Sequence, residues 1–188
     1  MTTGPTPEER LFAIQVGDAR PGAGPVVLVE YDPEWPGEFA REETRIRDAL
    51  GDTALQVEHV GSTSIPGIAA KPIIDIALVV PDSADETAYV PALEAAGYTL
   101  RVREPDWFEH RLLKDTDPSV NVHVFPAGCP EIERMLRFRD HLRRDAADRE
   151  LYEQTKRELA QREWKYVQHY ADAKSEVVEA ILERARAE

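Results

Sequence analysis

The stretch of residues 58–80, EHVGSTSIPGIAAKPIIDIALVV, constrains the fold and the function of this chain more than any other. It opens with a short β-rich run that ends at Gly61, and it closes with an apolar run, residues 73–80, that only Asp75 interrupts. A continuous apolar run of this length predicts a strand that is buried on both faces. Because a buried carboxylate is costly unless it is paired or bound to a metal, Asp75 needs a partner.

Between these two runs lies a glycine–hydroxyl turn made of Gly61, Ser62, Thr63 and Ser64. Glycine lets a backbone approach a phosphate closely, and the turn offers N–H groups and three hydroxyls to an anion. Ser64 is placed to cap a brief helix over residues 66–70, whose N-terminal dipole favours negative charge, and Lys71 follows. The layout is that of a phosphate-holding loop beside a metal-binding acid. On local physics alone an ordinary turn, with Asp75 capping a loop or paired with Lys71, explains the pattern equally well.

Length and composition narrow the class of protein. A chain of 188 residues with 42% hydrophobic content fits one compact domain with a real core. Its formal net charge of -13 repels a polyanionic duplex, so we expect no nucleic-acid partner. The single cysteine, Cys129, excludes an intrachain disulfide and a Cys-rich zinc site, and it fits a reducing cytoplasm as a small, partly buried residue. No run reaches membrane-spanning length, so we expect a cytoplasmic protein without a membrane partner.

The N-terminal half predicts an α/β domain that follows an arm. Residues 1–25 begin polar, hold one short predicted helix over residues 8–15 and then become rich in glycine and proline, which predicts a flexible N-terminal arm. A strand over residues 26–31 and a helix over residues 37–50 then precede the strands around the glycine–hydroxyl turn. This order of strands and helix is typical of the beginning of an α/β domain, which we expect to span residues 26–188.

The second half adds strands and then helices. A helix over residues 82–96 is followed by three closely spaced strands, over residues 98–102, 110–114 and 120–125. Their short separations indicate antiparallel additions to the sheet. From Pro130 onward the apolar side chains recur at helical spacing. The predicted fold is therefore α/β (α+β), a mixed β-sheet flanked by helices with a helical C-terminal portion.

Besides Asp75, the polar residues in apolar strand contexts are Glu58, His59 and His123. In the strand over residues 120–125, alternation places Asn121 and His123 on one face and the valines on the other. If that face meets the Asp75 side of the sheet, His123 is placed as a metal ligand or a general base. The alternative, favoured for a lone strand histidine, is a hydrogen-bonded structural role. It also applies to His59, but less strongly because His59 comes just before the glycine turn.

A basic segment, LRFRDHLRR, stands out in so acidic a chain. Arg139 and Arg143 are i,i+4 neighbours and face one way on the predicted helix. Two guanidinium groups on one face suit phosphate or carboxylate. Asp140 lies beside them, and a solvated face of ion pairs is the alternative.

Six spaced motifs occur in order: YDPxWP at residues 31–36, EHVGSTSIPG at 58–67, KPIIDI at 71–76, HV at 123–124, FRDxLR at 138–143 and YxxxK at 170–174. Together they resemble the GrpB-like family, and the resemblance covers the chain from about Val26 to the C-terminus. That family is similar to a branch of the nucleotidyltransferase superfamily, so the resemblance implies a nucleotidyltransferase-like mixed sheet flanked by helices. Some relatives look fused to dephospho-coenzyme A kinase, which hints at nucleotide metabolism.

Superfamily enzymes move a nucleoside monophosphate from a nucleoside triphosphate to an acceptor, using a Gly-Ser turn for the triphosphate and strand carboxylates for two divalent metals. By position, Gly61 and Ser62 match the turn and Asp75 matches the first carboxylate. The usual second acid is replaced here by Ala77, and the natural candidate for the third is His123. One acid and one histidine suit hard Mg²⁺ poorly, so Glu58 completes the site, a softer metal is used, or transferase chemistry has been lost.

The leading hypothesis is a cytoplasmic, metal-dependent nucleotidyltransferase that takes a nucleoside triphosphate and a small-molecule acceptor, with Mg²⁺ or Mn²⁺ as cofactor. Its predicted catalytic residues are Asp75, His123 and Glu58, with the metal on Asp75 and His123. Its predicted substrate-binding residues are Gly61, Ser62, Thr63, Ser64, Lys71, Arg139, Arg143 and Lys174. The alternatives are a noncatalytic nucleotide- or anion-binding module of the same fold, which Ala77 favours, and an interaction subunit that uses its acidic surface. The sequence identifies neither the nucleotide, the acceptor, the metal nor the oligomeric state.

Overall fold

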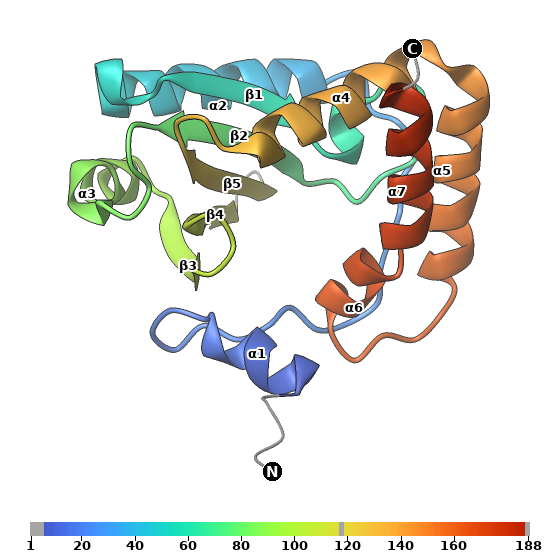
Figure 1. Cartoon of the computed structure of the whole chain (residues 1–188), viewed down its shortest axis with the longest axis horizontal. Coiled ribbons are helices and arrows are strands. Elements are labelled where there is room, and N and C mark those ends of the chain that lie inside the picture. The colour runs from blue at the N-terminus through green and yellow to red at the C-terminus, as the bar shows by residue number, and fades with distance from the viewer. Residues whose placement is uncertain (1–5, 117–118, 187–188) are drawn as a thin grey trace.

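The computed structural model describes residues 6–116 and 119–186. Its centre is a five-stranded sheet in the order β1-β2-β5-β4-β3 (Figure 1). The strands are β1 (Gln56–Val60), β2 (Ile74–Val80), β3 (Thr99–Glu104), β4 (His110–Thr116) and β5 (Ser119–Pro126). The α-helices are α1 (Pro7–Ala13), α2 (Trp35–Leu50), α3 (Val90–Ala95), α4 (Pro130–Arg144), α5 (Ala146–Ala160), α6 (Val167–Asp172) and α7 (Ser175–Arg186). Short 3-10 helices are η1 (Gly51–Thr53), η2 (Ser62–Ser64) and η3 (Glu86–Ala88).

The sheet is mixed, as predicted. Strands β2 and β5 run parallel, whereas the pairs β1–β2, β5–β4 and β4–β3 are antiparallel. Helices pack on both of its faces, and the C-terminal portion is helical. The predicted α/β fold is therefore confirmed.

Side chains of β2 alternate between two packed layers. Ile76 and Leu78 join the main core with α2 and α3. Ala77 and Val79 face the other way and pack with residues of α4. Asp75 belongs to this second set by the same alternation, and it is the one position of β2 that is not fully buried. The strand therefore carries its acid at the edge of the α4 layer.

The C-terminal helices form a wall at one end of the sheet, where α5 and α7 lie side by side and α6 lies below them (Figure 1). Their apolar faces pack with the segment that joins η2 to β2, in a cluster of Ile65, Ile68, Leu142, Tyr152 and Ile181. Among the described residues, none of the helices has the length and apolar character that a bilayer crossing requires.

Three predicted elements differ from the structure. The strand over residues 26–31 is reduced to a single bridge between Val29 and Ala70, because Pro72 follows shortly and has no N–H for a longer ladder. The helix over residues 66–70 is absent, because Gly67 adopts a φ of 83° that ends any right-handed turn, and η2 forms instead. The helix over residues 82–96 begins only at Val90, since proline at its start cannot continue an earlier turn.

The N-terminal segment lies along the free edge of β3 (Figure 1). Val16 N donates to Arg101 O at 3.0 Å, and Arg103 N donates to Ile14 O at 2.9 Å. Further along, Val167 N donates to the carbonyl of residue 22 at 2.8 Å. The described part of the expected flexible arm is thus hydrogen-bonded to β3 and to the start of α6. The division of the chain at residue 25 stays a prediction, and residues 1–5 lie outside the described residues.

Candidate functional site

Asp75, Asn121 and His123 meet on the α4 face of the sheet. The parallel register of β2 and β5 sets Asp75 beside Asn121 and Ala77 beside His123. Asn121 Nδ2 donates to Asp75 Oδ1 at 2.8 Å, and His123 Nε2 lies 3.7 Å from the same oxygen. The alternation predicted for β5 therefore brings His123 to the acid, and both side chains keep about a quarter of their surface exposed, 24% for His123 and 28% for Asp75.

The residues around Asp75 stabilise the charged form of its carboxylate. Burial raises the pKa of this carboxyl, but the hydrogen bond from Asn121 and the positive charge of Lys71 oppose this effect, and the pKa lies below its ordinary value. Asp75 is therefore ionised at neutral pH and can attract a cation.

Gly61 passes directly over this carboxylate. Its φ is 69°, and a Cβ at this position would lie 2.4 Å from Asp75 Oδ2. Only glycine combines the left-handed backbone with so close an approach. The turn and the acid are thus one structural unit, as the sequence spacing suggested.

The hydroxyls of the glycine–hydroxyl turn are largely engaged within the fold. Thr63 Oγ1 donates to Ile73 O at 3.0 Å, and Ser64 Oγ donates to Gly61 O at 2.6 Å. Both residues are buried. Ser62 is the more exposed hydroxyl, with its Oγ 3.4 Å from the Tyr152 hydroxyl.

His59 lies on the opposite face of β1, away from Asp75. Its ring stacks on Phe39 at 4.8 Å, and its Nε2 is 3.0 Å from Thr63 Oγ1. Burial lowers the pKa of His59 to about 4, so the ring is neutral at pH 7. The histidine supports the turn from beneath.

Three lysines surround Asp75. Burial lowers the pKa of both Lys71 and Lys114, and the charge of Asp75 opposes that shift in each case. Lys71 and Lys174 flank the ring of Tyr170, with Nζ 5.9 Å and 4.9 Å from its centroid. Across residues 6–116 and 119–186, none of the three ammonium groups forms an ion pair with a carboxylate. The site therefore carries an excess of positive charge in a protein whose formal net charge is -13.

A cavity of about 350 Å³ connects the sheet to the helical wall. Its polar lining comes from Gly61, Asp75 and His123 on the sheet side and from Glu131, Arg134, Arg139, Tyr152 and Lys174 on the helical side. A volume of this size is at the lower end for small-ligand sites.

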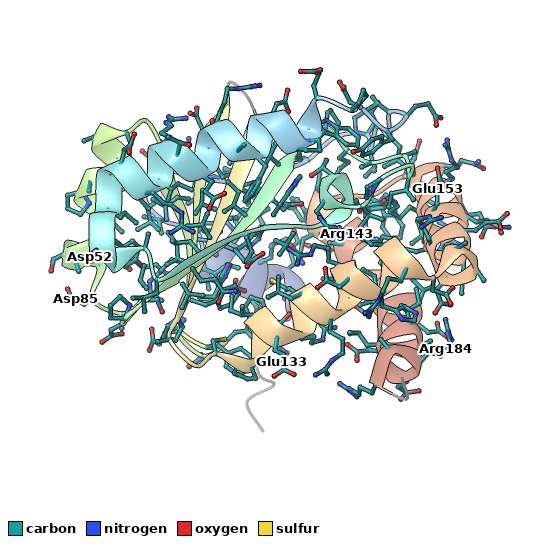
Figure 2. The ribbon with its side chains drawn as sticks, turned by 90° about the horizontal axis from the view of Figure 1, so that it is seen from above. Asp52, Asp85, Glu133, Arg143, Glu153 and Arg184 are labelled. Carbon is teal, nitrogen blue, oxygen red and sulfur yellow. The ribbon has the colours of Figure 1, made fainter. Side chains whose placement is uncertain are left out.

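The two predicted arginines of α4 have different surroundings. Arg139 lines the cavity and binds Glu58 Oε2 at 2.9 Å and His59 O at 3.1 Å. Arg143 donates twice to Ser64 O, at 3.0 and 2.8 Å. Figure 2 shows it between α4 and the η2 turn. Arg143 therefore braces the turn, whereas Arg139 combines a structural ion pair with a place in the cavity wall.

Of the residues predicted for the site, the cavity brings together Gly61, Asp75, His123, Arg139 and Lys174. The remaining ones, as far as the described residues show, are outside its lining: Glu58, Ser62, Thr63, Ser64, Lys71 and Arg143. Glu58 shares the Asp75 face but is paired with Arg139.

Sequence reasoning missed four neighbours of the site: Lys114, Arg134, Tyr152 and His110. His110 and Lys114 lie on the same face of β4, which a period-2 reading of that strand could have shown. Their proximity to His123 and Asp75 required the pairing of β4 with β5. The other two depend on how the helical wall docks, which no local pattern reveals.

The donor set of this site fits one divalent metal better than two. Two ligand atoms on a single metal, each about 2.0–2.2 Å from it, lie roughly 3–3.5 Å apart. Asp75 Oδ1 and His123 Nε2, at 3.7 Å, are close to that spacing. An oxygen and an imidazole nitrogen suit Mn²⁺ or Zn²⁺ more than Mg²⁺, which prefers oxygen ligands.

A second group of potential ligands lies elsewhere, at the junction of α4 and α5. His141, Asp145 and Asp148 come together there, among the residues that the structure describes. Asp148 already accepts from Arg184 through both oxygens and from His141 at 2.7 Å. This cluster is an ion-pair network that fastens α7 to α5.

Comparison with known proteins gives consistent results. The GrpB protein family model matches residues 25–184. A UPF0157 protein of Halalkalibacterium halodurans is 61% identical over 183 residues, which cover 97% of this chain and 94% of that protein. The crystal structure of the conserved protein GrpB from Enterococcus faecalis has a TM-score of 0.72 and 30% identity, covering 85% of this chain and 96% of that chain.

A dephospho-CoA kinase of Mycolicibacterium paratuberculosis is 36% identical over 177 residues, covering 80% of this chain but 44% of the kinase. A cytoplasmic RNA terminal U-transferase and the Cid1 poly(U) polymerase are much weaker matches, with TM-scores of 0.39 and 0.40, and carry no weight for this chain.

Proposed function

This chain belongs to the GrpB protein family, and we propose that its cavity binds a nucleoside triphosphate and transfers a nucleoside monophosphate from it to a small-molecule acceptor. The observation that carries the proposal is the pairing of Asp75 and His123 beside Lys71, Lys114 and Lys174, which form no ion pair with a carboxylate among the described residues. A carboxylate–imidazole pair suits a divalent cation, and unpaired ammonium groups suit phosphate oxygens. A nucleoside triphosphate with its metal presents both charges at once.

In the proposed reaction an acceptor oxygen forms a bond to the α-phosphorus while the bond from that phosphorus to the bridging oxygen breaks. Pyrophosphate leaves, and the acceptor proton passes to water. A divalent metal held by Asp75 and His123 would supply charge neutralisation at the phosphate oxygens. Lys174, which lines the cavity, and Lys71 would bind the negative charge of the triphosphate tail.

Glu58 has a smaller part in this proposal than the sequence suggested. Its Oε2 accepts from Arg139, and its Oε1 accepts from Gln56 at 3.1 Å. An acid committed to an arginine is a weak candidate for a metal ligand. We therefore assign Glu58 to holding Arg139 in the cavity wall.

The second candidate is a noncatalytic module that binds a nucleotide or another anion in the same cavity. Two observations favour it: Ala77 stands where the superfamily places its second acid, and Glu58, which lies opposite Ala77 on β1, is ion-paired with Arg139. Such a module would keep the cation-rich pocket without the metal arrangement that transfer requires.

Label transfer separates the two candidates. Native protein would be incubated with Mn²⁺, a pooled fraction of cellular small molecules, and ATP, GTP, CTP or UTP labelled at the α-phosphate. We expect label in a new small molecule together with an equal amount of pyrophosphate, and loss of both in Asp75→Asn. Asp52→Asn, which changes an exposed acid outside the cavity lining, is the control and should retain activity. Nucleotide binding without label transfer in the native protein would instead support the noncatalytic module.

A further inference from the structure

A line of polar contacts crosses four strands and ends at Asp75. It starts at Glu104 on β3, whose Oε2 lies 2.7 Å from His110 Nδ1. On the far side of that ring, His110 Nε2 lies 3.1 Å from His123 Nδ1. His123 Nε2 then faces Asp75 Oδ1 at 3.7 Å. Each histidine thus uses both ring nitrogens, and the line connects the edge of the sheet with the candidate metal site.

The His110 ring is locked in place by its surroundings. It is 3% exposed, and it lies 4.8 Å from the Phe125 ring and 5.0 Å from the Trp107 ring. Its plane is only 20° from that of His123. These ring contacts and a polar partner at each ring nitrogen hold His110 in one orientation.

The order of the partners decides where the protons lie. An ionised Glu104 can only accept, so the Nδ1 of His110 carries its proton. A His110 ring that holds its proton on Nδ1 has a bare Nε2, which accepts a hydrogen bond from His123. His123 then donates from Nδ1 to His110 Nε2, and in the tautomer with its proton on Nδ1 the bare Nε2 faces Asp75.

We propose that Glu104 and His110 are positioning residues that hold His123 in its Nδ1–H tautomer, with the Nε2 lone pair turned toward Asp75. In this state Nε2 and the Asp75 carboxylate are two acceptors that face each other, an arrangement that a cation between them stabilises. The inference deepens the proposed function and rests on it for the identity of the cation. Histidines that bind metals usually have their other ring nitrogen fixed by a hydrogen bond of this kind.

The first test reads the tautomer itself, without metal, nucleotide or turnover. Protein labelled with ¹⁵N at its histidine rings would be studied by long-range ¹H–¹⁵N correlation spectra, with His123 assigned through its loss in His123→Gln. In the native protein we expect the proton of His123 on Nδ1. His110→Phe, which keeps an aromatic ring between Phe125 and Trp107, should abolish this preference.

Because His110 is buried, His110→Phe could disturb the fold, so a second variant at a more exposed residue is also needed. Glu104 is 28% exposed at its side chain, so Glu104→Ala removes the start of the line at a tolerant position. It should weaken the tautomer preference of His123. Glu109→Gln is the matched control, because it removes the same charge from the same hairpin but contacts Arg111 instead of His110. It should leave the His123 tautomer unchanged.

The second test is titration calorimetry with Mn²⁺. Loss of the partner that orients a metal ligand typically costs about 10–100-fold in affinity. We expect a loss in that range for Glu104→Ala and His110→Phe, with native affinity in Glu109→Gln. A His123 ring protonated on Nε2 in the native protein would overturn the inference and leave the proposed function standing. The expected tautomer in a protein that binds neither Mn²⁺ nor a nucleotide would overturn the proposed function and leave the assignment of Glu104 and His110 intact.

Discussion

At the scale of single residues, Gly61 joins two requirements that no other amino acid meets together. Its backbone is left-handed, and the space beside its Cα is already filled by the Asp75 carboxylate. Gly67 shares the first requirement, with a φ of 83°, but nothing lies within 4 Å of the place where its Cβ would be. Substitutions at the two glycines therefore distinguish the effect of backbone strain from the effect of displacing Asp75.

Gly61→Ala should displace Asp75 and weaken nucleotide binding at least about tenfold, whereas Gly67→Ala should bind normally. Gly67→Ala should lose about 1–2 kcal/mol of unfolding free energy, because an alanine is strained at positive φ, and Gly61→Ala should lose more, because its Cβ also overlaps Asp75. Calorimetric titration with a nucleotide and urea unfolding would measure the two effects. Equal binding losses in both variants would contradict the proximity argument.

His59 gives the fold a defined pH dependence. Its pKa is lowered from 6.5 to about 4, burial being the largest cause. The unfolded state therefore binds more protons between these values, so the stabilising contribution is complete above pH 6.5 and is lost as the pH falls through 4. At about pH 5 the expected loss is about 2 kcal/mol.

Urea unfolding of the native protein and His59→Gln, at about pH 7.5 and about pH 5, tests this expectation. The variant should be less stable at the higher pH, but its fall in unfolding free energy between the two conditions should be smaller by about 2 kcal/mol. His110, whose pKa burial also lowers to about 4, contributes alike to both proteins. A pH dependence unchanged by the substitution would show that His59 does not titrate as described.

At this scale the sequence predicted those residues whose role follows from local spacing. Asp75 stood out as the one acid in an apolar run, and strand alternation placed His123 on a single face. Thr63 and Ser64 offered hydroxyls to an anion, but their partners are carbonyl oxygens within the fold, at Ile73 and Gly61. A hydroxyl has the same local pattern whether it meets a phosphate or its own backbone, so the sequence could not distinguish them.

At the scale of elements, α4 carries one arginine into the cavity and another to the turn beside it. Arg139 and Arg143 are adjacent on one face of the helix, as predicted, yet their hydrogen-bond partners differ. Arg139 reaches Glu58 of β1, and Arg143 reaches Ser64 O. Spacing along a helix predicts a shared face, but the surface that meets this face comes from the tertiary fold.

Replacing each arginine by alanine should separate these roles. Both variants should lose about 1–3 kcal/mol of unfolding free energy, because charge-assisted hydrogen bonds to partly buried acceptors are broken. Only Arg139→Ala should also weaken the binding of a nucleotide directly, by removing a guanidinium group from the cavity lining. Urea unfolding and calorimetry measure the two quantities. A larger binding loss in Arg143→Ala would place the ligand at the η2 turn instead of in the cavity that Arg139 lines.

Element boundaries were predicted best where the pattern was long. The strand β2 and the helix α2 formed within a residue or two of expectation, because apolar periodicity and stop signals agreed. The brief helix expected after Ser64 does not form. Its prediction rested on a single capping hydroxyl, and Gly67 favours a turn. The strand expected over residues 26–31 does not form, because the neighbouring segment offers it too few backbone hydrogen-bond partners. The sequence of residues 26–31 does not reveal this property of its neighbour.

At the scale of the whole molecule, the N-terminal segment covers an edge that would otherwise remain open. Its bonds to Arg101 and Arg103 occupy backbone groups of β3, the outermost strand. Uncovered strand edges invite pairing with other chains. Composition indicated a mobile arm because glycine and proline are frequent in it, and the order of the sheet, which places β3 at the edge, was not accessible from the sequence.

Removal of residues 1–25 should therefore lower the unfolding free energy by about 2 kcal/mol or more and promote self-association. Urea unfolding and sedimentation velocity would measure the two effects. Lys165→Gln serves as a comparison, because it removes the exposed ion pair between Lys165, just before α6, and Glu8 of α1, and an exposed pair of this kind should change the unfolding free energy little. A truncated protein that is monomeric and as stable as the full chain would show that the edge needs no cover.

Charge is distributed unevenly over the molecule, and this distribution supports the central proposal. Most described arginines pair with carboxylates, whereas Lys71, Lys114 and Lys174 lie near Asp75 and form no such pair with any residue that the structure describes. The formal net charge of -13 keeps polyanions away in general, but the site itself attracts small anions. A compact, highly charged ligand such as a metal-bound triphosphate fits both conditions.

The most direct test is calorimetric titration of the purified protein with ATP, GTP, CTP and UTP, each with and without Mg²⁺ or Mn²⁺. The proposed site predicts binding of at least one nucleotide that strengthens with metal, persists in Asp52→Asn and loses its metal dependence in Asp75→Asn. Absence of binding under every condition, in a native protein shown to be folded, would contradict the nucleotide proposal and leave another anion as the ligand of this cavity.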